Sequence, residues 1–374
     1  MNRRQFLTTS SLLSVGLATQ SVLPNFAFAG GNKLKILVLG GRDFFGPTLV
    51  ETLISMGHQV TLFNRGFTNA HLFPHLTWIK GDREVADGSG FANLKQHLVS
   101  HKYDWVIDTW QKLPTAVRDT AKVLKPHIGQ YHYVSSISVY KDKATAQIDE
   151  NYPLKDLSKS NIENPRLPYS ERKAWSETAL FDELGDKVTT FRSHGMRSDR
   201  TPNRIYEPYW PSRFLAGGEI LLPKDKDHVM QVCDVKSMID FMILAQSKGL
   251  SGAFNVARET RTFSEYIDDV TSVTKTSHEK VWIPKTFLAN EGIEPYRDLP
   301  FWRPQLPGFY HINVEKALKA GLKNRSIQAM VTDQLTGYLR RNPNQDYFFG
   351  ARGTISRQKE AKVIAKWRQN NPVV

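Results

Sequence analysis

The side chains best suited to chemistry stand in two short segments of the chain. Tyr169 and Lys173 belong to the segment YSERK, and their spacing of four places a phenol and an ammonium on the same face of a helix. A nearby positive charge lowers the pKa of a tyrosine, so that its phenolate becomes a usable base near neutral pH. We therefore predict Tyr169 as a catalytic acid/base and Lys173 as the residue that lowers its pKa.

The second segment, YVSSISVY at residues 133–140, is an apolar strand whose end is rich in hydroxyls. A hydroxyl at this point can bind the carbonyl or alcohol oxygen of a substrate. Ser136 is the catalytic candidate here, and Ser138 is a weaker candidate for substrate binding.

A third segment, KILVLGGRDFFG at residues 35–46, predicts a buried parallel strand, a tight turn and the first turn of a helix. That arrangement aims backbone N–H groups and a positive helix end at one point, which suits a pyrophosphate. The alternative is a glycine-rich turn without a ligand. The predicted cofactor-binding residues in this turn are Gly40, Gly41, Arg42, Phe44, Phe45 and Gly46.

The residues that follow the next strands indicate which nucleotide the chain binds. A protein that binds NAD usually has an acidic residue after the second strand, but this chain has Asn64 and Arg65. An arginine can pair with a 2′-phosphate, so these residues favour NADP over NAD without excluding NAD. Asp82 is placed to accept a hydrogen bond from the adenine amino group, and Thr109 also faces the cofactor. We predict no metal site.

Strands and helices alternate along the first two thirds of the chain, which predicts an α/β fold of the Rossmann type, a doubly wound parallel sheet with a smaller C-terminal substrate lobe. We assign residues 33–195 to the nucleotide-binding domain, with later contributions from about 229–257, and residues 196–228 and 258–374 to the lobe. One of the later contributions is a strand expected at Gln231–Val235. Ligands of such sheets lie beyond the carboxyl ends of the strands.

The first 29 residues read as a targeting segment. Arg3 and Arg4, followed by Phe6-Leu7, a mild apolar stretch and the small-residue site Ala27-Phe28-Ala29, indicate a twin-arginine signal peptide. We therefore expect recognition by the twin-arginine translocase, an exported or periplasmic chain and no stable membrane insertion. The formal charge of +13 and the pI of about 9.6 favour acidic partners, and the single cysteine excludes an intramolecular disulfide.

These motifs, in this order, resemble the extended short-chain dehydrogenase/reductase family in its NAD-dependent epimerase/dehydratase branch, from about Lys33 to Trp367. The resemblance implies Tyr169 as the acid/base, Ser136 as the catalytic hydroxyl, Lys173 as a ligand of the nicotinamide ribose, and a homodimer. The turn departs from the usual TGxxGxxG because Asp43 replaces the middle glycine. Its GGxxFxG form, followed by FNRG, is similar to an atypical subgroup that includes the chloroplast stem-loop RNA-binding proteins.

The substrate is expected to be a small molecule of carbohydrate type, because arginines and aromatic residues suit sugar rings that carry an anionic group. The alternative for Tyr209 and Trp210 is a place in the lobe core, and we interpret His194 as structural. The candidate substrate-binding residues, besides Ser138, are Trp110, Arg197, Tyr209, Trp210 and Arg213.

Two functions follow. The first is an exported NAD(P)-dependent epimerase/dehydratase or oxidoreductase whose cofactor is tightly held, because free NAD(P) is expected to be scarce outside the cytoplasm. The second is a non-catalytic nucleotide-binding protein that binds RNA or an acidic polymer through its basic surface.

Overall fold

The computed structural model describes residues 33–200, 208–344 and 354–371. The signal peptide predicted for residues 1–29 lies outside these ranges. A seven-stranded parallel sheet forms the centre, in the order β11-β6-β5-β4-β1-β2-β3. The strands are β1 (Lys35–Leu39), β2 (Gln59–Asn64), β3 (Thr77–Lys80), β4 (Tyr103–Asp108), β5 (Ile128–Ser136), β6 (Val188–Ser193) and β11 (Gly252–Val256). The predicted fold class, a Rossmann-type α/β sheet, is confirmed.

The strand order reverses between β1 and β4, and this switch point is where open parallel sheets bind ligands. Ile36, Leu37 and Val38 in β1 are fully buried, as expected of a strand with helices over both faces. The glycine turn after β1 and the segment after β4 therefore meet at one crevice.

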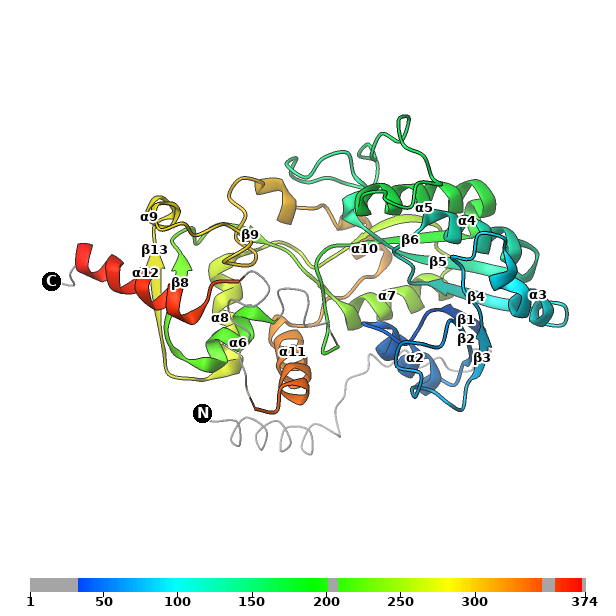
Figure 1. Cartoon of the computed structure of the whole chain (residues 1–374), viewed down its shortest axis with the longest axis horizontal. Helices are drawn as coiled ribbons and strands as arrows, with labels where there is room; N and C mark the ends of the chain where they lie inside the picture. The colour runs from blue at the N-terminus through cyan, green and yellow to red at the C-terminus, as the bar shows by residue number, and fades with distance from the viewer. Residues whose placement is uncertain (1–32, 201–207, 345–353, 372–374) are drawn as a thin grey trace.

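Helices cover both faces of the sheet (Figure 1). One face packs against α2 and α7, and the opposite face packs against α3, α4 and α5. Pro47 in the first turn of α2 and Asp234, whose side chain accepts a hydrogen bond from the Ser237 N–H at the start of α7, fix where two of these helices begin. The helices are α2 (Gly46–Ser55), α3 (Ala92–Leu98), α4 (Pro114–Leu124), α5 (Tyr169–Leu184) and α7 (Val235–Ser247).

The second lobe packs beside the sheet around its own aromatic core, which includes Phe214, Phe263 and Trp302. Its elements are α6 (Tyr209–Ala216), β8 (Gly218–Pro223), β9 (Val229–Met230), β12 (Arg261–Thr262), α8 (Phe263–Thr274), β13 (His278–Ile283), α9 (Lys285–Asn290), α11 (Ile327–Arg341) and α12 (Arg357–Asn370). The short strands β7 (Met196–Arg197) and β10 (Cys233–Asp234), and helix α10 (Glu315–Ala320), connect the lobe to the sheet.

The strand expected at Gln231–Val235 is present but shorter, because only Cys233–Asp234 form a strand, β10. The chain crosses here from the lobe to the sheet. It forms one two-residue strand on the lobe side and another on the sheet side. β9 pairs antiparallel with β12 in the lobe, whereas β10 pairs parallel with β7.

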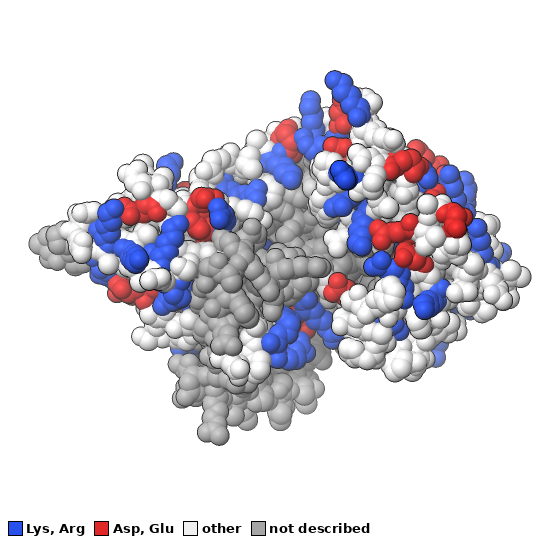
Figure 2. All heavy atoms as spheres, viewed as in Figure 1, with Lys and Arg blue, Asp and Glu red and all other residues white. Residues whose placement is uncertain are grey.

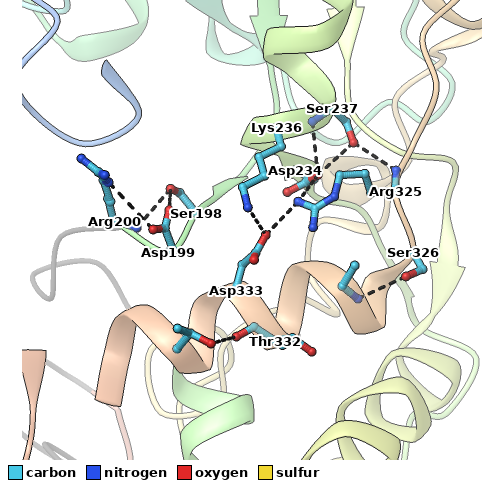
Figure 3. A network of polar contacts seen from close by, with 12 residues as sticks. Ser198, Asp199, Arg200, Asp234, Lys236, Ser237, Arg325, Ser326, Thr332 and Asp333 are labelled. Carbon is cyan, nitrogen blue, oxygen red and sulfur yellow. Dashed lines mark hydrogen bonds and ion pairs between the residues drawn. The ribbon is translucent and has the colours of Figure 1, made fainter. Parts of the chain in front are cut away.

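A polar network ties the lobe helix α11 to α7 (Figure 3). Arg325 Nη1 lies 2.8 Å from a carboxylate oxygen of Asp333 and 3.3 Å from Asp234. Lys236 Nζ lies 2.9 Å from the same Asp333 carboxylate. Because these charges come from α7, α11 and the segment before α11, the network holds the lobe against the sheet domain. In the described part of the chain, no helix combines the length and the apolar character needed to span a membrane.

Three of the predicted substrate residues lie in the lobe core, and this is a correction. Tyr209, Trp210 and Arg213 are at most 6% exposed and do not line the cavity described below. The Trp210 Nε1–H donates to the Pro300 carbonyl oxygen at 2.7 Å. The fully buried Arg213 guanidinium forms an ion pair with Glu360 of α12 at 2.9 Å. These residues join α6 to its neighbours.

The ion pair between Arg213 and Glu360 leads to a prediction about stability. Glu360→Gln leaves a buried guanidinium without its counter-charge, which should lower the free energy of unfolding by about 3–5 kcal/mol. The control is Glu294→Gln, which breaks the exposed pair with Arg297 and should cost about 0–1 kcal/mol. Urea denaturation of the two variants measures both values, and equal losses would contradict the structural role of the buried pair.

Candidate active site

A cavity of about 570 Å³ opens at the carboxyl ends of the central strands. Its walls come from the segments that follow β1, β2, β3, β4, β5 and β6, together with lobe residues between positions 296 and 310. The cavity therefore brings together the three segments on which the prediction of chemistry rested.

Glycine is required in the turn after β1 because of its backbone conformation and its close contacts. Gly40 and Gly41 have φ values of +110° and +85°, which side chains other than glycine rarely adopt. A Cβ at Gly40 would lie 2.7 Å from Thr109 Oγ1, and a Cβ at Gly46 would lie 2.8 Å from the carbonyl carbon of Gly41. The glycines thus let β1, α2 and the segment after β4 approach one another at the cavity wall.

Asp43, which replaces the usual middle glycine, is exposed and folds back on the turn. Its Oδ1 accepts a hydrogen bond of 2.9 Å from the N–H of Phe44, a residue with a φ of +50°. The neighbouring Arg42 guanidinium packs over the ring of Trp78, 5.1 Å from its centroid. The carboxylate is thus satisfied locally, and the Arg42 charge remains at the cavity wall.

The predicted nucleotide-selecting residues have different surroundings. Asn64 is used by the protein, because its Nδ2 donates to the Gly40 carbonyl and its Oδ1 accepts from the Gly66 N–H. Arg65 lies 3.5 Å from Glu84 and 3.9 Å from Asp82, the residue expected to bind adenine. The Arg65 charge is therefore partly offset by two carboxylates.

The catalytic candidates Tyr169 and Ser136 both line the cavity. Tyr169 is the first residue of α5 and is 40% exposed, yet its phenol lies in the cavity. Burial there raises the pKa of Tyr169, while the Ser136 hydroxyl and the charge of Arg172 lower it. Ser136 Oγ also accepts a hydrogen bond of 3.2 Å from the Ser138 N–H.

Lys173 lies one helical turn beyond Tyr169 and is only 2% exposed. Its Nζ donates to the Trp110 carbonyl at 2.6 Å, the Val134 carbonyl at 2.7 Å and the Tyr133 hydroxyl at 3.0 Å. Burial lowers the pKa of Lys173 to about 7. The role predicted for Lys173, to lower the pKa of Tyr169, stays a prediction.

A buried ion pair holds one of the backbone segments that Lys173 contacts. The sequence analysis did not predict this pair. The guanidinium of Arg83 donates two hydrogen bonds, of 2.8 Å and 2.7 Å, to the carboxylate of Asp108 at the end of β4. Asp108 also accepts from the Tyr131 hydroxyl at 2.6 Å and from the Trp110 N–H at 2.9 Å. The pair holds the backbone of Trp110, whose carbonyl accepts from Lys173. The signal that could have revealed the ion pair is that Arg83 follows β3 and Asp108 ends β4, so that both polar residues lie at the same edge of the sheet.

The predicted substrate residues Trp110, Ser138 and Arg197 line the cavity. The Ser138 hydroxyl is buried without a partner, and Arg83 packs 5.1 Å from the Trp110 ring centroid. Several lining residues were not predicted for the site: Lys143, His194, Tyr296, Phe301, Phe309 and Tyr310. Sequence periodicity carries no signal for them, because they come from irregular segments that meet only in the folded chain.

A glycine turn at the switch point of a doubly wound parallel sheet is the architecture of dinucleotide-binding α/β proteins. Residues 36–257 match the model of the NAD dependent epimerase/dehydratase family, and the chain belongs to this family. It is 26% identical over 247 residues to chloroplast stem-loop binding protein of 41 kDa b from Arabidopsis thaliana. That match covers 62% of this chain and 60% of the relative's length.

Solved structures share the fold at lower identity. dTDP-glucose 4,6-dehydratase from Bacillus anthracis, in complex with NAD, has a TM-score of 0.56 at 17% identity, over 83% of this chain and 98% of the other. UDP-glucuronic acid 4-epimerase from Bacillus cereus, in complex with NAD, has a TM-score of 0.58 at 15% identity, over 83% of this chain and 99% of the other.

The pKa of Lys173 leads to a prediction about pH. The folded chain loses this proton near pH 7, whereas an unfolded lysine keeps it to about pH 10.5. Between these values the unfolded state binds more protons, so this group makes the free energy of unfolding rise with pH. Lys173→Met removes that rise.

Urea denaturation between pH 7 and about pH 9.5 should show the wild type gaining stability relative to Lys173→Met, but not relative to the exposed Lys141→Met. A difference from Lys173→Met that does not change with pH would contradict the buried, deprotonating lysine.

Proposed function

We propose that the mature chain is an exported NAD(P)-dependent epimerase/dehydratase or oxidoreductase that acts on a sugar or sugar-like substrate. The single observation that carries the proposal is the cavity in which the glycine turn, Ser136, Tyr169 and Lys173 line one space. Membership of the epimerase/dehydratase family supports the reaction class. The relatives that act on nucleotide sugars support a carbohydrate substrate by analogy.

The residues at the cavity fit a nicotinamide dinucleotide. Among the described residues, no side chain caps the N-terminus of α2, Arg42 supplies a positive charge at the cavity wall, and the Ser138 hydroxyl is buried without a partner. Gly40, Gly41 and the N-terminus of α2 would hold the pyrophosphate, and Lys173 and Thr109 would lie along the nicotinamide half. When bound, the cofactor supplies hydride acceptance and return.

The protein side chains move and hold the proton. Tyr169 is placed to take the proton of a substrate hydroxyl as that carbon is oxidised, and to return it on reduction. Ser136 holds the same oxygen and stabilises the charge that develops on it. Lys173 is fixed by two backbone carbonyls and the Tyr133 hydroxyl, one helical turn beyond Tyr169.

The choice between NADP and NAD rests on two arginines. Arg42 packs on Trp78 and makes no ion pair within the described ranges, and Arg65 follows β2, so a 2′-phosphate has two candidate cations. Asp82 and Glu84 weaken this argument because they offset the charge of Arg65. We favour NADP on the Arg42 charge, and identification of the released nucleotide decides the question.

Export and cofactor loading lead to a linked prediction. If the twin-arginine route carries the folded chain, protein collected from the exported fraction of a bacterial host should release a near-stoichiometric amount of nicotinamide nucleotide on denaturation. Replacing Arg3 and Arg4 by lysine should keep the chain in the cytoplasm with its nucleotide still bound. Export of the lysine variant would contradict the route, and an exported, folded chain without nucleotide would contradict the tightly held cofactor.

The second candidate function is a non-catalytic protein that binds RNA or an acidic polymer, and the match to a stem-loop binding protein favours it. The intact Ser136, Tyr169 and Lys173 set argues for catalysis. Among the described residues on the face shown in Figure 2, lysine and arginine side chains are also interspersed with acidic ones. We therefore place this function second.

Tyr169→Phe separates the two functions. An enzyme should lose about 10²–10⁴-fold in turnover, because the proton-transfer group is gone while the ring remains. A binder should be unaffected. Turnover is followed by nicotinamide absorbance with a panel of sugars, and binding is followed by anisotropy of a labelled RNA hairpin. The control is Tyr152→Phe, a half-buried tyrosine of the neighbouring loop that does not line the cavity. Equal turnover in the two variants would contradict the enzymatic proposal.

A further inference from the structure

The end of the cavity formed by β6 and the lobe differs in chemistry from the glycine turn. In the sheet, β6 lies three strands away from β1, so His194 and Arg197 are separated from the cofactor turn. The lobe adds an aromatic wall on the same side. Its lining residues are Tyr296, Phe301, Phe309 and Tyr310. If the proposed function is right, this is the substrate end.

Cations are concentrated at this end. Lys143 and Arg197 line the cavity, with Lys143 Nζ 5.8 Å from the Phe309 ring centroid and the Arg197 guanidinium 4.7 Å from that of Phe301. Arg303 lies behind the wall, 3.5 Å from the Tyr296 centroid and 4.3 Å from that of Phe309. Among the residues that the structure describes, neither Lys143 nor Arg303 forms an ion pair with a carboxylate, and no acidic residue of the lining comes from this end.

His194 supplies a second observation that points to a ligand. It is 3% exposed, stacks on Tyr310 with centroids 5.2 Å apart, and its Nε2 is buried without a hydrogen-bond partner. Burial lowers the pKa of His194 to about 3, with Arg197, Arg303 and Lys143 lowering it further and the Phe309 backbone raising it. The ring is therefore neutral. If its other nitrogen donates to the Phe309 carbonyl, Nε2 accepts a hydrogen bond from a ligand.

Partly buried cations without counter-charges are costly, and an anion supplied by the substrate removes that cost. An aromatic wall suits the apolar face of a ring, and the neutral His194 suits a hydroxyl on it. We propose that this end of the cavity binds a hydroxylated ring through an anionic substituent, a carboxylate or a phosphate. Lys143 and Arg197 contact the anion, Arg303 adds to the positive potential, and His194 Nε2 accepts from a neighbouring hydroxyl.

Calorimetry on the mature, nucleotide-loaded chain tests this inference with three probes. Methyl glucuronide carries a carboxylate, glucose 6-phosphate carries a phosphate, and methyl glucoside is neutral. At least one anionic probe should bind about tenfold or more tightly than the neutral one, as expected for a charge-assisted hydrogen bond. Lys143→Gln should remove most of that preference. Lys141→Gln removes the same charge from an exposed position two residues earlier and should leave it intact.

The outcomes are separable from those of the proposed function. Preference for the glucuronide assigns a carboxylate, and preference for the sugar phosphate assigns a phosphate ester; either supports the inference if it is lost in Lys143→Gln and falls with added salt. Equal binding of all three probes, no binding of either anionic probe, or a preference unchanged by Lys143→Gln would overturn it. The nucleotide content is measured on the same sample, so an empty cofactor site is recognised independently of the probe affinities.

Discussion

The geometry of the site depends on one buried ion pair, between Arg83 after β3 and Asp108 at the end of β4. Removing two charges from water is costly, and such a pair is stable only when its remaining hydrogen-bonding groups are satisfied. Here the Tyr131 hydroxyl and the Trp110 N–H complete the carboxylate, and the Ala116 carbonyl accepts from Arg83. The chain after β4 is thereby fixed at the switch point of the sheet.

The ion pair between Arg83 and Asp108 also affects the proposed catalytic residues, because it fixes the backbone that they contact. The Trp110 carbonyl accepts from both the Tyr133 hydroxyl and Lys173 Nζ, so the ion pair, β5 and α5 are joined in one hydrogen-bonded chain. Burial in this network lowers the pKa of Lys173. The position of the lysine is therefore determined by residues far from it in sequence, and the pKa of Tyr169, one helical turn away, likewise depends on the distant Ser136.

This division explains what could be predicted from the sequence. Strand and helix periodicity, the glycines that require positive φ and the spacing of Tyr169 and Lys173 are local signals, and they located the fold and the candidate chemistry. Whether a side chain faces the cavity is not local. Trp210 and Arg213 have the composition of a sugar site, but α6 turns them into the lobe core. Lys143 and His194 carry no pattern, yet the fold brings both to the cavity.

The distribution of charge gives the site a direction. The carboxylates in the described lining, Asp43 and Asp82, both lie at the glycine-turn end. Asp43 accepts a hydrogen bond from the Phe44 N–H, and Asp82 lies 3.9 Å from Arg65. From Lys173 to the lobe the lining carries positive and neutral groups. A dinucleotide would bring its own negative charge to the first end, so Lys143 at the other end is proposed to pair with an anion of the substrate. The charge distribution over the cavity thus favours a different anionic group at each end.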